Sequence, residues 1–436
     1  MGAVGFLLKT PYFLNTAHLH NQKRGEDRYM KIRYFFRTPH IGKKVFQLNR
    51  PIKAISLLFF MYMIGWGIVD PILPVYINHL FGTYLSVGIF MSSLQFFALF
   101  FSLAVGPLLN RVQKKSLISV ALALYTSMSP LLLWVKTMVG FVVLRFYHSI
   151  LLTTLWATSD AYVREHSTKH KEAQAIGLFD FSVGLAQVVG GILCALTIGF
   201  FGFNIIYAVS LFTFIALIRS LSLPDHKKQP KLLRCIGCIS YTQIKKECSD
   251  ALKNKAMTRL MFHSFPFYIG VSLMPMTIPL FVDYMGGSLP MVGIASALFY
   301  VPVLFESYFS TKKNSIHTST LGIIGAAAFF LTMFFTTDVR FMFLLSFCIG
   351  IAFSAVHPII SGRFTEFMPK DEVGELSALV YGMKSLAAGI GPLLAGVIAE
   401  WMGIRYVFMV GFVLMGILIP FHSNILKIDE TSIIRE

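Results

Sequence analysis

The feature that most constrains this chain is a succession of apolar segments, each long enough to cross a membrane. A transmembrane helix needs about 20 predominantly apolar residues. Such segments occur six times before and six times after a polar stretch that begins at Leu223. Their approximate bounds are 54–79, 86–109, 116–135, 139–163, 173–199, 203–222, 258–283, 289–309, 317–336, 340–363, 375–400 and 404–423. Because these segments are continuously apolar, they do not fit the alternating strands of a membrane barrel, and we predict an all-α polytopic membrane protein with twelve transmembrane helices.

Composition and charge agree with a membrane-embedded chain. Hydrophobic residues make up 55% of the 436 positions and charged residues only 14%, against about 25% charged residues in soluble domains. If the N-terminus is cytoplasmic, 33 of the 38 Lys and Arg residues fall on the cytoplasmic side, three on the other side and two within segments. Loops rich in Lys and Arg stay in the cytoplasm, so we expect both termini there, in a cell (inner or plasma) membrane.

The two sets of six segments match each other at one offset of 205 residues. Matching pairs are Pro74 and Pro279, Gly82 and Gly287, Gly88 and Gly293, Gly177 and Gly382, and Gly191 and Gly396. Such a pattern indicates a parallel repeat, in which an axis along the membrane normal relates two six-helix halves. We therefore divide the chain into a basic N-terminal segment (1–53), an N-terminal bundle (54–222), a linker (223–257), a C-terminal bundle (258–423) and a tail (424–436).

Two motifs stand in the first half of the chain. The first segment reads G-x-G-x-x-x-P-x-L-P from Gly65 to Pro74. The loop after the second segment runs from Gly106 to Lys115 and is similar to G-x-L-x-D-R-x-G-R-K. It departs from that pattern at Asn110, which replaces the acid, and at Gln113, which replaces a glycine.

A third motif, close to G-P-x-x-G-G, starts at Gly391 in the eleventh segment, and the fifth segment has a version without the proline. With these motifs, residues 54–423 resemble the major facilitator superfamily, closest in style to its drug and metabolite proton antiporters. The resemblance implies transport by alternating access. It also implies that the first and fourth helices line a central cavity, where the family often has an arginine at the position of Arg145.

Ionisable residues within the segments are the strongest candidates for chemistry, because a charge at the bilayer centre costs at least about 2.5 kcal/mol. Asp70 and Arg145 lie at similar depths in the first and fourth segments. They are expected either to form a proton-responsive pair in the transport pathway or to hold the two helices together as a static ion pair. Of the two, Asp70 is our preferred proton site.

Further candidates fall into three groups. Tyr62, Trp66, His148 and His357 lie within segments; the first two are candidates for lining a cavity, and the histidines are either proton carriers or hydrogen-bonded bundle residues. We assign a conformational gate to Gly106, Asn110, Arg111, Lys114, Asp160, Glu165, Asp180, Glu306 and Lys384. The resemblance implies that Lys114 pairs with an acid at the end of the fourth segment, Asp160 or Glu165. We assign close helix packing to Gly190, Gly191, Gly391, Pro392 and Gly396.

No cofactor or metal is expected. Cys235, Cys238 and Cys248 lack a clear fourth ligand, and the chain has no glycine-rich ATP loop. We interpret the protein as a secondary transporter that exports a small amphipathic drug or metabolite in exchange for protons. The partners are then this small-molecule substrate, protons and the lipid bilayer, with no nucleic acid. Proton-coupled uptake of a nutrient is the alternative. An enzyme should show a catalytic cluster and a receptor a sizeable outer domain, and the sequence shows neither.

Overall fold

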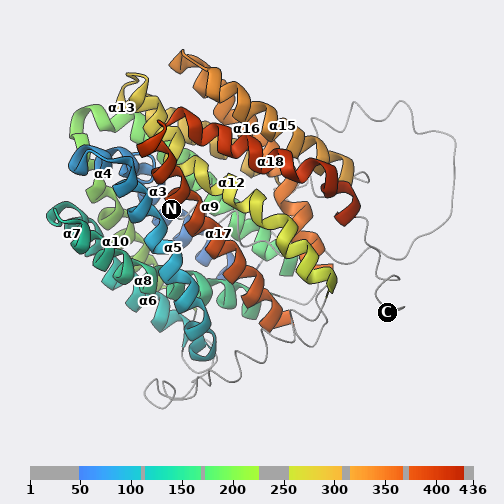
Figure 1. The fold of residues 1–436 in the computed structure, drawn as a ribbon. Coiled ribbons are helices and arrows are strands. Elements are labelled where there is room, and N and C mark those ends of the chain that lie inside the picture. The colour runs from blue at the N-terminus through green and yellow to red at the C-terminus, as the bar shows by residue number, and fades with distance from the viewer. Residues whose placement is uncertain are drawn as a thin grey trace, which may run out of the picture.

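A computed structural model of the chain describes residues 49–109, 113–167, 172–224, 255–306, 315–366 and 373–426, and these residues are helical apart from short connections (Figure 1). The first half contains α3 (Arg50–Val69), α4 (Leu73–Phe81), α5 (Tyr84–Leu109), α6 (Lys114–Tyr125), α7 (Met128–Trp134), α8 (Met138–His166), α9 (Glu172–Phe201), the 3-10 helix η1 (Gly202–Tyr207) and α10 (Ala208–Leu221). The second half contains α12 (Lys255–Tyr284), α13 (Leu289–Tyr300), η3 (Val301–Phe305), α15 (Ser315–Phe335), α16 (Val339–Glu366), α17 (Val373–Trp401) and α18 (Arg405–Leu426).

These helices correspond to the twelve predicted spans. Ten described helical segments are long and apolar enough to cross a membrane, and Leu289–Phe305 is a shorter apolar segment. One of the ten, Ala175–Leu221, has 47 residues and accounts for two spans, because it contains both α9 and α10. The predicted all-α polytopic fold is therefore confirmed.

The helices run alternately between two ends of the bundle. The termini face is the end at which Arg50 and Leu426 lie. The opposite face carries the turns at Gly82, Gly202, Gly286 and Gly403, whose φ angles are 70°, 52°, 76° and 102°. Glycine suits these turns because a side chain is strained at positive φ.

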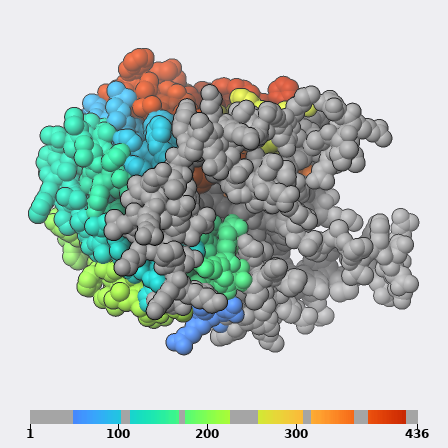
Figure 2. Space-filling model, turned by 90° about the horizontal axis from the view of Figure 1, so that it is seen from below, coloured from blue at the N-terminus to red at the C-terminus, as the bar shows by residue number. Residues whose placement is uncertain are grey.

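The two halves lie side by side. In Figure 1 most blue-to-green helices lie toward the left and most yellow-to-red helices toward the top and right, with α13 at the upper left and α17 running downward beside α5. Figure 2, seen from below, shows blue-to-green residues on one side and orange-to-red residues along the upper edge. Extensive contacts between the halves join α5 to α17 and α9 to α13.

Glycines make these inter-half contacts close. A Cβ at Gly88 of α5 would lie 3.0 Å from Cα of Gly396 on α17. A Cβ at Gly293 of α13 would lie 2.9 Å from the carbonyl oxygen of Gly191 on α9. The offset of 205 residues relates Gly88 to Gly293 and Gly191 to Gly396, so the two contacts are equivalent. We call them the paired glycine contacts, and they are expected for halves related by a two-fold axis.

The helices differ in how much of their surface is buried within the protein. The most apolar window of α12 is 83% buried within the protein, whereas that of the α9–α10 segment is 28% buried. Large apolar side chains such as Leu196, Phe200, Leu211 and Phe214 are exposed on α9 and α10. In water such a surface would be costly, and in a bilayer it faces lipid.

Candidate functional site

Asp70 stands where the first span breaks. Its backbone N–H donates to the Trp66 carbonyl at 2.7 Å and closes α3. Pro71 follows and has no N–H to continue the helical hydrogen bonds, so α4 starts only at Leu73. The break places Asp70, which is 8% exposed, inside the membrane-spanning segment Arg50–Phe81.

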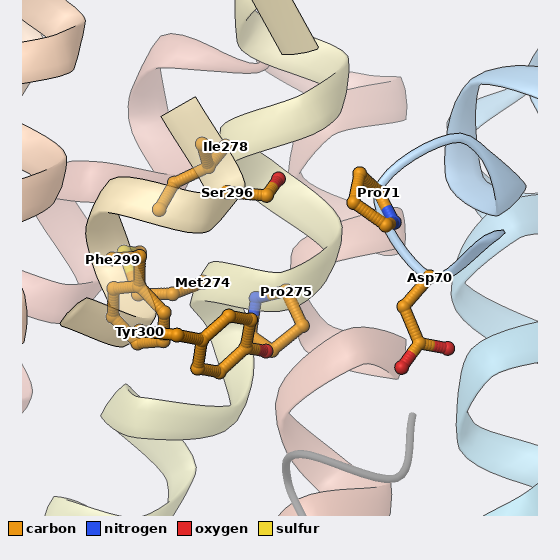
Figure 3. A pocket seen from close by; sticks show the side chains of 8 residues that line it. All are labelled: Asp70, Pro71, Met274, Pro275, Ile278, Ser296, Phe299 and Tyr300. Atoms are coloured by element: carbon orange, nitrogen blue, oxygen red, sulfur yellow. The ribbon is translucent and has the colours of Figure 1, made fainter. Parts of the chain in front are cut away.

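Asp70 lines a pocket between the two halves (Figure 3). Asp70 and Pro71 form one wall, and the other comes from the second half: Met274, Pro275, Ile278, Ser296, Phe299 and Tyr300. Figure 3 shows the Asp70 side chain facing Pro275 and Tyr300 across this space. The pocket is tight, with internal room on the order of one water molecule. A carboxylate therefore sits at the contact between the two halves.

Arg145 is fully buried in α8 and belongs to a separate cluster. Its Nε donates to the Phe90 carbonyl at 3.2 Å, and its guanidinium carbon lies 3.6 Å from the centre of the Phe90 ring. Its Nη1 lies 2.8 Å from Nδ1 of His148, whose Nε2 is hydrogen-bonded to the hydroxyl of Tyr125. Trp66 stacks on His148 with ring centres 4.8 Å apart. Sequence reasoning missed Tyr125, a polar aromatic residue in a span.

The structure does not bring Asp70 and Arg145 into an ion pair. Among the described residues, Arg145 bonds to Phe90 and His148, while Asp70 accepts from Nε2 of Gln187 at 3.5 Å. The static pair considered from the sequence is therefore not formed in this conformation. Tyr62 joins the Arg145 side of the site, with its ring 5.3 Å from that of Tyr125.

The second half contains its own buried polar cluster. Nδ1 of His357 on α16 is hydrogen-bonded to Oε1 of Glu306, which directly follows η3. Nε2 of His357 lies 3.3 Å from Oγ of Ser361, and Nζ of Lys384 on α17 donates to the same hydroxyl at 3.1 Å. All four residues are at most 8% exposed. The sequence placed Glu306 and Lys384 in a gate and His357 in a proton pathway, and the structure brings them together.

At the termini face, Nζ of Lys114 pairs with Glu165 at 2.7 Å, whereas Asp160 pairs with Arg164 one turn along the same helix, at 3.1 Å. Of the two acids proposed for Lys114, the structure therefore selects Glu165. Gly106 falls in α5, and Asn110 and Arg111 lie outside the described residues. Asp180 is buried in α9.

At the opposite face, polar contacts join the two halves. The carboxylate of Glu400 on α17 accepts from the backbone N–H groups of Tyr84 and Leu85, at 2.7 and 3.3 Å. These are the first residues of α5, where free N–H groups and the helix dipole favour an anion. His79 lies 3.4 Å from Asp283. The opposite face is thus closed, by residues that sequence reasoning did not identify.

The residues assigned to packing lie at helix contacts. A Cβ at Gly190 would lie 2.6 Å from Cα of Gly67 on α3, and one at Gly391 would clash with the hydroxyl of Ser272 on α12. Gly191 and Gly396 make the paired glycine contacts, and the carbonyl of Pro392 faces Gly88. Only glycine allows such close approach.

Within the described residues, no group of three or more His, Cys, Asp or Glu side chains is placed to hold a metal. Cys235, Cys238 and Cys248 lie outside those residues. The clusters that the structure does show are hydrogen-bonded networks that join side chains of several helices.

Comparison with known proteins identifies the family. The family model described as "Major Facilitator Superfamily" matches residues 55–317 and 304–433. A "Probable sugar efflux transporter" of Pasteurella multocida is 26% identical over 281 residues, which are 61% of this chain and 63% of that protein. An uncharacterised MFS-type transporter of Methanocaldococcus jannaschii is 24% identical over 151 residues, or 34% of this chain and 39% of that protein. The chain thus spans less than two thirds of the length of either relative.

Solved structures share the fold at low identity. The nucleoside transporter NupG is 15% identical, with a TM-score of 0.68, over 87% of this chain and 100% of that one. The human organic anion transporter MFSD10 is 14% identical, with a TM-score of 0.64, over 87% of this chain and 99% of that one. With a family model that matches most of the chain, a helical membrane fold and these neighbours, the chain belongs to the major facilitator superfamily and is a multi-pass membrane protein.

Proposed function

We propose that this transporter is a secondary active exporter, which moves a small amphipathic drug or metabolite out of the cell in exchange for protons. The observation that carries the proposal is the position of Asp70, a buried carboxylate in the pocket between the two halves. In alternating access the halves rock against each other around a central site. The surroundings of a group at their contact therefore change in every cycle.

A carboxylate in such a place responds to the cycle through its solvation. In the present closed conformation Asp70 is shielded by apolar walls that include Pro275 and Phe299. Separation of the halves would replace these apolar walls with water around the Asp70 carboxyl group. Alternation between the two states thus couples proton movement to the conformational change.

Two observations favour export as the direction. The first span carries the exporter-like pattern from Gly65 to Pro74, and Asp70 lies within it. The Pasteurella multocida relative is named as a sugar efflux transporter. Sugars and similarly sized polar metabolites are therefore the first substrates to test, followed by amphipathic drugs. A symporter for uptake would use the same carboxylate, so the experiment must report direction.

The test is transport in proteoliposomes that contain the full chain, with a proton gradient imposed in each direction. A panel of labelled sugars and amphipathic compounds identifies a substrate, and an entrapped pH dye reports coupled proton movement. Antiport predicts that substrate and protons move in opposite directions. Asp70→Asn should abolish gradient-driven accumulation but retain substrate exchange. Asp338→Asn, which removes an exposed acid that caps the Arg340 N–H at the opposite face, should retain both.

Three results would count against the proposal. Movement of substrate and protons in the same direction would favour uptake by symport. Gradient-driven accumulation by a folded Asp70→Asn protein would exclude Asp70 as the proton site. If Asp70→Asn fails to fold and a second substitution, Arg145→Gln, rescues it, the two residues act as a static pair in another conformation.

A further inference from the structure

One tautomer of His357 is compatible with every hydrogen bond of the buried cluster in the second half. Lysine has only donors, so Lys384 must donate to Oγ of Ser361. In that tautomer the Ser361 hydroxyl donates to Nε2 of His357, and Nδ1–H of His357 donates to the Glu306 carboxylate. In this arrangement the imidazole is neutral, Lys384 carries one positive charge and Glu306 one negative charge. The relay is therefore neutral overall and links two ions through two neutral side chains.

We propose that the Glu306–His357–Ser361–Lys384 relay is a second protonation site of this transporter, separate from Asp70, and that its proton biases the conformational equilibrium. One added proton makes both imidazole nitrogens donors, so that Ser361 accepts from His357 as well as from Lys384. The relay then gains a net charge of +1 and the Ser361 hydroxyl must turn away from His357. One proton thus changes both the charge and the hydrogen-bond pattern across three helical segments. The inference rests on the transporter assignment and does not require Asp70 to carry a proton.

Burial argues against a purely structural role for the relay. His357, Ser361 and Lys384 are each at most 3% exposed. The attraction within a buried ion pair often does not offset the free energy of removing both charges from water. Well-packed apolar side chains in the same place often stabilise a fold as much as the ion pair does, or more. The membrane adds to that cost. The chain nevertheless keeps four polar groups on three segments, which fits a site that must change its charge.

Among the described residues, Glu306 is the one acid that forms a hydrogen bond within the relay. On α12, the Tyr268 ring lies 5.0 Å from Nζ of Lys384 and 6.0 Å from the His357 ring. On α9, which packs against η3, the acids are Glu172 and Asp180. The other titratable residues on the helices that carry the relay are Arg340, Cys348, Arg363 and Glu366 on α16 and Glu375, Tyr381 and Glu400 on α17.

The position of Lys384 connects the relay to the inter-half contact. On α17, Lys384 lies between Gly382 and Gly389. A Cβ at Gly382 would lie 3.1 Å from Cδ1 of Leu99, and one at Gly389 would lie 2.9 Å from the Phe96 ring, both on α5 of the first half. A shift of Lys384 therefore moves the same helix segment that touches the first half. A change in the charge of the relay can therefore alter the packing of α17 against α5, and with it the rocking of the two halves.

The experiment measures conformation without substrate, so it is independent of the export proposal. Spin labels replace Trp134 and Thr337, which are exposed at the opposite face on different halves. Their distance distribution in the purified full chain, in lipid nanodiscs, gives the ratio of open to closed opposite face from about pH 5 to about pH 8. If one relay proton is coupled to the change, the wild-type ratio should shift by up to about tenfold per pH unit.

The variants decide where this pH dependence originates. In Glu306→Gln the open-to-closed ratio should no longer change with pH, whereas Glu306→Asp should keep the pH dependence. Asp70→Asn should also keep a pH-dependent component, and adding Glu306→Gln to that variant should remove it. If Glu306→Gln does not fold, the double variant Glu306→Gln/Lys384→Met, which removes both charges, should fold and show a flat profile. A wild-type ratio that does not change with pH overturns the proposal. So does an unchanged pH profile in Glu306→Gln or in the folded double variant. Neither result affects the Asp70 transport test.

Discussion

Gly88→Ala should open the opposite face, because the added methyl group has no room in the closed conformation. Its Cβ would lie 2.7 Å from the carbonyl oxygen of Pro392 and 3.0 Å from Cα of Gly396. The shorter distance is about 0.7 Å less than the 3.4 Å at which ordinary contact begins. Both neighbours are backbone atoms, which no side-chain rotation can move. The two helices must therefore separate.

The size of the effect follows from the cost of overpacking. An extra methyl group in a well-packed interior costs about 1–3 kcal/mol. Here the cost falls on the conformation in which α5 and α17 touch, and it disappears when the opposite face opens. The open-to-closed ratio should therefore rise by a factor of about 5 to about 150. Impaired transport should follow, since the cycle requires return to the closed state.

The assay is the same pair of spin labels at Trp134 and Thr337. Gly416→Ala is the matched control, because it makes the same substitution within a helix at a position where a Cβ meets nothing within 4 Å. The two variants should have similar thermal stability in detergent, but only Gly88→Ala should shift the distance distribution toward the open state. Equal distributions in Gly88→Ala, Gly416→Ala and wild type would refute the reasoning, since the close contact would then cost nothing.

Three further predictions concern charges and topology. Glu400→Gln weakens the bonds to the start of α5, and the charge–dipole loss of about 0.3–1 kcal/mol should raise the open fraction up to about fivefold in the spin-label assay; no change would remove Glu400 from the closed state. Lys114→Ala should slow turnover and leave substrate affinity nearly unchanged, and the charge-swapped pair Lys114→Glu/Glu165→Lys should recover turnover; unchanged transport in Lys114→Ala would exclude the loop from the mechanism. Cys235 in the linker should resist an impermeant thiol reagent added outside intact cells, and its labelling would overturn the predicted orientation.

The number and order of spans could be predicted from the sequence, because membrane-spanning helices need a length of apolar chain that few other structures require. The predicted first span, 54–79, corresponds to α3 and α4 together. Pro71 lies at the break between them, but the hydrogen-bond pattern that ends α3 at Val69 depends on the folded backbone. The second half has a similar interruption between α13 and η3, which carries Pro302.

Contacts between side chains were harder to predict. Sequence position gives the depth of a residue in the membrane, and on that basis Asp70 and Arg145 looked like partners. It does not give the direction in which a side chain points around its helix. In the structure Asp70 faces the second half, whereas Arg145 faces Phe90 and His148 within the first. The relay of Glu306, His357 and Lys384 escaped notice for the same reason, although the three lie toward the termini face of their helices.

Pairing at the termini face was more accessible, because motif resemblance supplied the partner of Lys114. At the opposite face no motif pointed to Glu400. Its partners are backbone N–H groups of Tyr84 and Leu85, and these carry no signature in the sequence. Every helix has free backbone N–H groups at its N-terminus. Only the packing of α17 against α5 shows that Glu400 binds those of α5.

The paired glycine contacts have a consequence for how charge is distributed over the molecule. Two equivalent contacts of this kind are what a symmetric dimer of identical six-helix chains would have, and in such a dimer every side chain occurs twice. In this single chain the positions 205 residues from Asp70 and Lys384 hold Pro275 and Phe179, neither of which ionises. Covalent joining lets each half keep an acid or a base that the other lacks, without placing like charges on both sides of the axis. Two copies of either half should therefore assemble with a similar shape and yet be unable to perform the work of the whole chain.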